Sequence, residues 1–480
     1  MDHAEQQVSS PIGQDMSKKE VSDLEGSQAG IKEGNLEYVD TSHDAVWGDM
    51  TDGPNYRSVG WVGTVALMMK TQVGLGVLSI PAAFNTLGLI PGVICLLIIA
   101  LITTWSDYII GVFKLRHPEV YGIDDAGGLI FGRIGREVLG AAFCLYWIFV
   151  AGSGILSLSI GLNAVSTHGT CTAVFIAVAA VVGCMFGSMQ TLGRISWLAW
   201  LGLFCILASI FTVTVAVGIQ DRPAAAPQDG PWESDFELFK SPPFHSAITA
   251  VSSLVFAYAG TPAFFAIAAE MRDPRLYTRS LAFCQSGVTI TYIAIGCVVY
   301  YFCGSYVASP ALGSAGVLMK KVCYGLALPG LLATTTIVIH IPAKHIFLRV
   351  LRGSDHLASN TFIHWATWLG CTIGITLVAY IIASAIPVFG SLVSLIGALL
   401  GTLMCFQPMG CMWLYDNWSK GKEERSVKWT ATAAFAIFVV VSGTFLMIAG
   451  TYGSVVDIMN TYKESGGSAA WTCADNSNSV

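Results

Sequence analysis

The chain has 480 residues, of which 54% are apolar and only 12% are charged, and its mean hydropathy is +0.63. Soluble domains carry about one quarter of charged residues, so this composition excludes an ordinary water-soluble protein. Residues 1–57 hold twelve acidic and four basic side chains, a balance of −8, so the rest carries +2 of the net charge of −6. The body lacks the clustered basic residues that bind phosphates, and we expect no nucleic-acid partner.

The amino-terminal residues 1–57 are polar and acidic, with no apolar run that would form a cleavable signal peptide. Their composition predicts a disordered cytosolic tail, because few large apolar side chains are present to offset the entropy of ordering. Ser9, Lys18 and Lys19 are candidate sites for regulatory or ubiquitin machinery. An inert solubilising tail is the alternative.

Apolar runs of about 20 residues, the length that crosses a bilayer as a helix, predict an all-α integral membrane protein surrounded by lipid. Ten or twelve spans are alternatives to the count of eleven, because the fourth run is short and the gap at Pro387 is narrow. The eleven candidate spans are 60–84, 89–112, 137–162, 172–189, 195–219, 246–269, 280–303, 323–346, 362–386, 388–414 and 430–453.

Basic residues in short loops indicate the orientation, because they are retained on the cytosolic side. With a cytosolic amino terminus, fourteen Lys and Arg lie in inside loops and four in outside loops. This bias predicts a multi-pass membrane protein whose polar end, residues 454–480, is an extracellular tail. The Pro-rich loop 220–244 is the one long outer connection and resembles a lid.

Thirteen cysteines are spread singly, without the spacing of a metal site or a dense disulfide scaffold. Most are expected to be small apolar core residues. Cys303 and Cys323 flank one outer loop and could pair in an oxidising exterior, and burial as free thiols is the favoured interpretation.

Two spans are interrupted near their centres. The first contains Gly74, Gly76 and Pro81, and the sixth contains Gly260 and Pro262. Glycine lowers helix propensity and proline removes a backbone donor, so both helices are expected to unwind at mid-membrane. Such glycines can serve packing alone, but two breaks at matching positions five spans apart favour a transporter binding site between inverted repeats.

At these residues the sequence resembles the amino acid/auxin permease family. The resemblance rests on three motifs: Lys70-x-x-x-Gly74-x-Gly76-x-Leu78-x-x-Pro81, the stretch from Phe256-Ala257-Tyr258 to Glu270-Met271-Arg272-Asp273-Pro274, and Pro387-Val388-Phe389-Gly390-Ser391-Leu392. The resemblance covers roughly residues 58–450, and within the family the sequence is most similar to fungal neutral amino-acid permeases. It implies a LeuT-like fold of 5+5 inverted repeats, with helices 1–5 over about 60–219, helices 6–10 over about 246–414 and an eleventh helix. It also implies proton-coupled uptake across the plasma membrane.

By this resemblance, the unwound helices bind an amino acid through backbone amide and carbonyl groups. No charged side chain is expected in the pocket itself, which favours a neutral aliphatic or aromatic substrate, since a charged one would be buried unpaired. Phe256 and Tyr258 have plain core packing as an equal alternative. The candidate substrate-binding residues are Thr71, Gly74, Leu75, Gly76, Val77, Tyr146, Phe256, Ala257, Tyr258, Gly260 and Thr261.

Ionisable side chains within spans are candidates for coupling to a cation, because burying them is costly. Lys70 is expected to need a carboxylate partner, and Glu270 is preferred to Asp107 for that place. In sodium-coupled relatives the ion lies between helices 1 and 8, where Thr335 is the best match in this chain. A proton is the preferred coupling ion, sodium is possible, and a permanent structural ion pair is the alternative role for the charges.

Other functions are less well supported by the sequence. A channel would need a continuous polar filter, which the spans lack. A membrane enzyme would need a nucleophile or paired acids, and the histidines are scattered without them. A nutrient receptor of the same fold stays open, because sensing and transport share one site. No cofactor is expected.

Overall fold

The computed structural model describes residues 59–477, apart from short gaps, and the predicted tail 1–57 lies outside the described residues. The gaps are 190–191, 224, 352–353, 355, 358–360, 387, 424, 465–470 and 472. Within the described part the chain is helical, and its one recorded β contact is an isolated bridge between Val59 and Met271.

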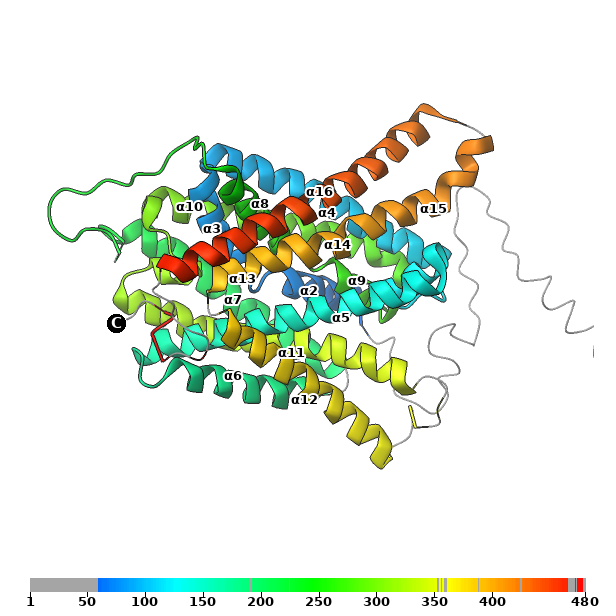
Figure 1. The fold of residues 1–480 in the computed structure, drawn as a ribbon, viewed down its shortest axis with the longest axis horizontal. Helices are drawn as coiled ribbons and strands as arrows, with labels where there is room; N and C mark the ends of the chain where they lie inside the picture. The colour runs from blue at the N-terminus through cyan, green and yellow to red at the C-terminus, as the bar shows by residue number, and fades with distance from the viewer. Residues whose placement is uncertain are drawn as a thin grey trace, which may run out of the picture. The chain divides into compact units, whose positions relative to one another are not determined.

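The helices follow the expected apolar runs (Figure 1). Short 3₁₀ turns occupy Gly76–Ser79, Pro274–Leu276, Gly304–Tyr306 and Ala311–Ser314, and a π-helical turn occupies Ile396–Gly401. The α-helices are α2 (Trp61–Gln72), α3 (Ile80–Leu87), α4 (Leu89–Arg116), α5 (Ile123–Ser166), α6 (Thr172–Gly187), α7 (Leu192–Ile219), α8 (Phe244–Tyr258), α9 (Thr261–Ala269), α10 (Tyr277–Cys303), α11 (Val317–Leu351), α12 (Phe362–Ala385), α13 (Phe389–Leu395), α14 (Thr402–Cys405), α15 (Gln407–Glu423) and α16 (Val427–Glu464).

Ten helical segments of the described chain are long and apolar enough to cross a membrane. Each of three spans combines several helices: α2 with α3, α8 with α9, and α13 through α15. The expected fourth span, 172–189, is the 16-residue helix α6, about 24 Å long at about 1.5 Å per residue. The eleven predicted spans therefore correspond to ten long helices and one short apolar helix.

The helices form two groups. Helices α5, α6, α11 and α12 contact one another and lie together in the lower half of Figure 1; we call them the scaffold helices. The interrupted spans α2–α3 and α8–α9 pack with α4 and α10, and we call these the bundle helices. Helix α7 contacts α2 and α10 of the bundle and α11 of the scaffold. The two breaks consequently lie where the groups meet.

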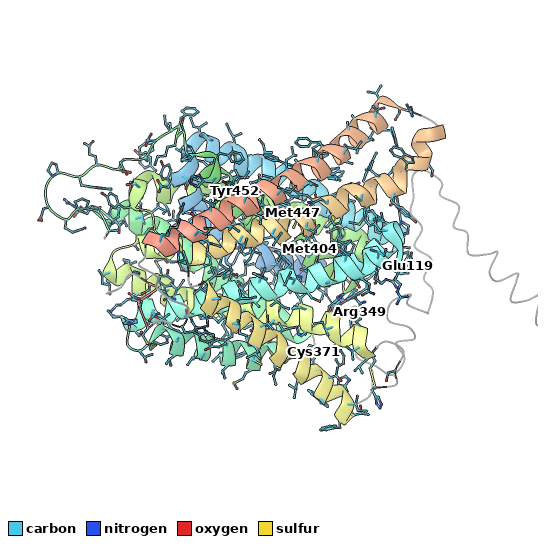
Figure 2. All side chains as sticks on the ribbon, in the orientation of Figure 1. Glu119, Arg349, Cys371, Met404, Met447 and Tyr452 are labelled. Atoms are coloured by element: carbon cyan, nitrogen blue, oxygen red, sulfur yellow. A yellow bond between two sulfur atoms is a disulfide. The ribbon has the colours of Figure 1, made fainter. Side chains whose placement is uncertain are left out.

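An ion pair and a histidine–carboxylate contact join α5 to α11 near the end where the chain leaves α11. Arg349, labelled in Figure 2, donates hydrogen bonds to Glu137 of α5. One turn earlier, His345 Nε2 lies 3.9 Å from an Asp124 carboxylate oxygen. These contacts fix the scaffold helices to each other at the side where most loop Lys and Arg residues lie.

The loop between α7 and α8 packs on the start of α4. The amides of Leu89 and Ile90 donate to the carbonyls of Glu237 and Leu238, at 3.1 and 3.0 Å. Gly88 precedes them with a φ of 90°, and a Cβ there would lie 2.7 Å from the backbone nitrogen of Lys240. Only glycine fits this close approach without strain. The loop is therefore anchored over the α3–α4 corner.

The carboxyl-terminal segment differs from expectation. Helix α16 continues to Glu464, eleven residues beyond the predicted end, because no helix breaker follows Gly453. A disulfide joins Cys473 to Cys171 at the start of α6, whereas Cys303 and Cys323 are free and buried, as the favoured interpretation expected. Sequence alone did not indicate the true pair, because its cysteines are 302 residues apart.

Polar contacts support the attachment of this segment to the scaffold helices. The Asn163 amide of α5 donates to Asn476 Oδ1 at 2.7 Å, and Asn476 in turn donates to Ser159 at 3.1 Å. The Thr172 hydroxyl of α6 donates to the Ala474 carbonyl at 2.7 Å. Residues 473, 474 and 476 are thus attached to the scaffold helices.

Candidate functional site

The first break lies between α2 and the 3₁₀ turn that begins at Gly76. Helix α2 ends at Gln72, and the Val73 amide still donates to the Met69 carbonyl at 2.6 Å. The amides of Gly74 and Leu75 donate no backbone hydrogen bond within the described chain. Both residues are buried, at mid-span, where lipid offers no replacement partner. Two N–H donors are therefore free at the centre of the bundle.

The second break separates α8 from α9 at Ala259 and Gly260. Pro262 at the start of α9 cannot donate to the preceding turn, which frees carbonyls there. Two tyrosine hydroxyls donate hydrogen bonds to carbonyls at this break. Tyr292 of α10 donates to the Ala257 carbonyl at 2.7 Å, and Tyr146 of α5 donates to the Ala259 carbonyl. Tyr146 thereby links a scaffold helix directly to the break.

The two breaks touch each other at glycines. A Cβ on Gly76 would lie 2.4 Å from the Cα of Ala257, and one on Gly260 would lie 2.8 Å from Thr71 Oγ1 and from Gln72 Cγ. Real Cβ atoms essentially never come that close. Gly76 therefore requires glycine for its contact with the Ala257 backbone, whereas Gly260 packs against the side chains of Thr71 and Gln72. The fold thus brings together the predicted residues Thr71, Gly76, Ala257 and Gly260.

Other predicted residues are buried around this contact, but their side chains face different neighbours. Leu75 and Val77 are buried in the core. Phe256 faces the π-helical turn, since a Cβ on Gly397 would lie 2.9 Å from its Cβ. Tyr258 faces α10, because its ring packs on Tyr292 and its hydroxyl bonds to Thr289 at 3.0 Å.

Gln72 is a further site residue that our sequence analysis missed. Its side chain is 3% exposed, and neither its amide nitrogen nor its amide oxygen has a hydrogen-bond partner in the described chain. It lies against Gly260, at the contact of the two breaks. Burying an unpaired amide costs free energy, so this group is suited to a polar ligand. A polar side chain two residues before a mid-membrane Gly-x-Gly was the available signal.

Comparison with known proteins identifies the family. A family model described as transmembrane amino acid transporter protein matches residues 57–456. The chain belongs to this family. This transporter is 34% identical over 442 residues to a "transmembrane transporter" of Gibberella moniliformis, covering 91% of each chain. It is 31% identical over 430 residues to the "N amino acid transport system protein" of Neurospora crassa, covering 87% of this chain and 89% of the relative.

A solved structure supports the same fold. The transporter aligns with a Na⁺-coupled sialic acid symporter at a TM-score of 0.54 and 13% identity, covering 85% of this chain and 93% of that chain. The expected LeuT-like fold and the resemblance to the amino acid/auxin permease family are both confirmed. The protein is therefore a membrane-embedded amino-acid transporter and not an enzyme.

The expected pairing of Lys70 with Glu270 was wrong. Glu270, at the end of α9, forms a buried ion pair with Lys344 of α11, with Nζ 2.7 Å from Oε1. Lys70 is fully buried and its Nζ lies 3.4 Å from the Val73 carbonyl, next to the first break. No ion pair joins Lys70 to a carboxylate in the described chain. Sequence spacing indicated only how deep Lys70 and Glu270 lie in their spans. It did not indicate that Lys344 of α11 is the side chain that pairs with Glu270.

In the threonine run, the structure turns Thr334, and not the predicted Thr335, toward α2. Thr334 faces α2, because a Cβ on Gly74 would lie 2.9 Å from Thr334 Oγ1. Thr335 faces α5 instead, where a Cβ on Gly154 would lie 2.7 Å from its Oγ1. Adjacent residues on a helix point about 100° apart, so only one of them can face α2. Any cation between α2 and α11 would meet Thr334.

Asp107, on α4, is fully buried, and it has no basic partner in the described chain. Gln285 of α10 donates to its Oδ2 at 2.5 Å, and Thr261 lies beside it at the start of α9. Asp107 and Thr261 are thus neighbours, although our sequence analysis assigned one to coupling and the other to substrate binding.

Proposed function

We propose that this transporter imports neutral amino acids together with protons by alternating access. The free amides of Gly74 and Leu75 are the observation that carries this proposal. Paired N–H donors at the start of a half-helix attract a carboxylate, because their partial positive charges point at it. Every α-amino acid has that carboxylate, whatever its side chain.

The surroundings of the breaks support a neutral substrate. Thr71, Gln72, Tyr146, Ala257 and Thr334 contact the breaks with side chains that carry no formal charge, and Lys70, whose Nζ lies 3.4 Å from the Val73 carbonyl, is the ionisable group beside them. A charged substrate side chain among them would be buried without a counter-ion, at a cost of several kcal/mol in a low-dielectric site. Aliphatic and aromatic side chains avoid that cost.

Lys70 supports a proton over a sodium ion. Its Nζ approaches the Val73 carbonyl, and its Cε lies 3.1 Å from the position of a Cβ on Gly202 of α7. That same Gly202 position lies 2.4 Å from Ala333 of α11, next to Thr334. A protonated Lys70 would thus repel a sodium ion bound between α2 and α11.

Flux through reconstituted protein tests this proposal. In proteoliposomes, radiolabelled leucine, phenylalanine or alanine should accumulate under an inward proton gradient, and a protonophore should abolish accumulation. Replacing sodium with choline should change nothing. Uptake that choline abolishes and a protonophore spares would assign sodium as the coupling ion, and saturable binding without flux would indicate a receptor.

A matched pair of variants tests the substrate site. Gln72→Leu should raise the KM for uptake, because the buried amide next to Gly260 is lost. Gln228→Leu makes the same exchange in the outer loop and should leave uptake unchanged. Equal KM values for both variants would remove Gln72 from the substrate site.

We place the transporter in the plasma membrane with its carboxyl terminus outside. The Cys171–Cys473 disulfide supports this orientation, because such bonds persist on oxidising, non-cytosolic sides of membranes. The loop charges agree, since the cytosol retains Lys and Arg. An epitope fused after residue 480 should be accessible on intact cells; detection only after permeabilisation would contradict this orientation.

A further inference from the structure

The environment of Asp107 differs from that of every other carboxylate in the membrane-spanning part of the described chain. It lies nine residues before the end of α4, or about 14 Å along the helix. Its side chain is 0% exposed. Glu270, at similar burial, has Lys344 as a counter-ion, whereas Asp107 has only amide, hydroxyl and thiol neighbours.

Oxygen atoms without partners gather at this carboxylate. Asp107 Oδ1, Gln285 Oε1 and Thr261 Oγ1 are all buried and all lack a hydrogen-bond partner in the described chain. Gln285 Nε2 already donates to Asp107 Oδ2. Asp107 Oδ1 and Gln285 Oε1 are therefore unpaired atoms of two side chains that are hydrogen-bonded to each other. Leaving such groups unpaired is expensive, and a bound cation removes the cost for several of them at once.

We infer that Asp107 is the proton-binding site of the transport cycle, with Gln285 and Thr261 as its positioning residues. A proton on Oδ1 neutralises the buried charge and supplies an O–H donor for Gln285 Oε1 or Thr261 Oγ1. The proton comes from the outer solution and leaves to the cytosol, so no other reactant is needed. This inference rests on the proposed function, because it assigns the ion that function requires.

The position of Thr261 connects this site to the substrate. Thr261 is the first residue of α9 and follows Gly260 directly, so it lies at the second break. The Ala259 carbonyl, two residues earlier, accepts the bond from Tyr146 of the scaffold. The start of α9 also favours an anion, because the positive end of the helix dipole lies there. Protonation of Asp107 removes that attraction and changes how firmly α9 is held against α4.

The titratable groups around Asp107 are few. Helix α10 presents Tyr277, whose hydroxyl donates to the Asp107 carbonyl at 2.9 Å, and Cys284. Helix α14 presents Cys405, next to Thr261. None of these carries a formal positive charge. A charge change at Asp107 is consequently not masked by a neighbouring basic group.

The test uses full-length protein in proteoliposomes with a pH-sensitive dye inside. Wild-type protein should acidify the lumen when a neutral amino acid is added outside. Asp107→Asn keeps the shape and mimics the protonated acid, so it should lose this acidification and lose pH-driven accumulation, while exchange of internal for external amino acid continues. Asp457→Asn, the same exchange in α16, is the matched control and should retain both activities.

The outcomes separate this inference from the proposed function. Wild-type protein that never moves protons contradicts the proposed coupling itself. Proton movement by wild type and by Asp107→Asn alike overturns only the role of Asp107. Sodium-dependent uptake that Asp107→Asn abolishes overturns both the proton role of Asp107 and the proposed proton coupling. If Asp107→Asn fails to assemble, Asp107→Glu serves instead: a shifted pH profile of uptake is expected, and an unchanged profile overturns the inference.

Discussion

Adding a single methyl group at Gly76 should push the two breaks apart. A Cβ on residue 76 would lie 2.4 Å from the Cα of Ala257 and 3.1 Å from its Cβ and backbone nitrogen. Since carbon atoms settle about 3.5 Å apart or more, the two backbones must part by about 1 Å. Overpacking of this kind costs about 1–3 kcal/mol in stability. The contact is with backbone, so no side-chain rotation can relieve it.

The functional loss should exceed the loss of stability. A misplacement of about 1 Å in a binding geometry can lower a rate by about 10²-fold, so uptake by Gly76→Ala should fall by about that factor. Uptake is measured per molecule at the cell surface. Gly370→Ala is the control, because nothing lies within 4 Å of a Cβ there, and its uptake should be unchanged. Uptake of Gly76→Ala within a factor of two of the control would refute the contact between breaks.

Three other perturbations test the contacts around the site. Gly74→Ala should reduce uptake through its clash with Thr334, and adding Thr334→Ala should restore part of it, because that substitution removes the Oγ1 at 2.9 Å; no rescue would contradict the assigned register of α11. Lys344→Gln should cost about 3–5 kcal/mol, since it leaves Glu270 buried without a counter-ion, whereas the double substitution with Glu270→Gln should melt closer to wild type in detergent; equal melting temperatures would argue against the pair. The hydrogen bond to the Asp416 carboxylate raises the pKa of His117 at the end of α4, so this contact stabilises the fold below about pH 6.5 and is lost as pH rises through the raised value. His117→Asn should flatten the fall in melting temperature between pH 6 and 8, and an unaltered slope would exclude this histidine.

Sequence patterns were sufficient for the spans and for the breaks. Apolar runs located ten long helices and α6 because hydropathy reports burial in lipid directly. Gly74, Gly76, Gly260 and Pro262 marked the interruptions, since their effect on a helix is local. Backbone chemistry depends on residues close in sequence, and one chain is enough to predict it.

Side-chain partners across helices were not predictable in the same way. The Glu270–Lys344 pair depends on the rotation of α11 about its own axis, and so does the choice of Thr334 over Thr335. Neighbouring residues on a helix point about 100° apart. Hydropathy predicts the rotation of a lipid-exposed helix about its axis too coarsely to choose between them. The Cys171–Cys473 disulfide is harder still to predict, because it depends on tertiary contacts between residues 302 positions apart in the sequence.

The positions of the buried charges suggest why α9 is the element that must respond to the coupling ion. At its start α9 meets Asp107 through Thr261, and at its end it is tied to the scaffold by Glu270 and Lys344. Neutralising Asp107 therefore acts at the end of α9 nearest the substrate, while the ion pair resists movement at the other end. A nine-residue helix is too short to bend appreciably, so α9 moves as a rigid body when the charge of Asp107 changes. Weakening the Glu270–Lys344 pair should then favour the conformation open to the cytosol, because that pair opposes the departure of α9 from α11.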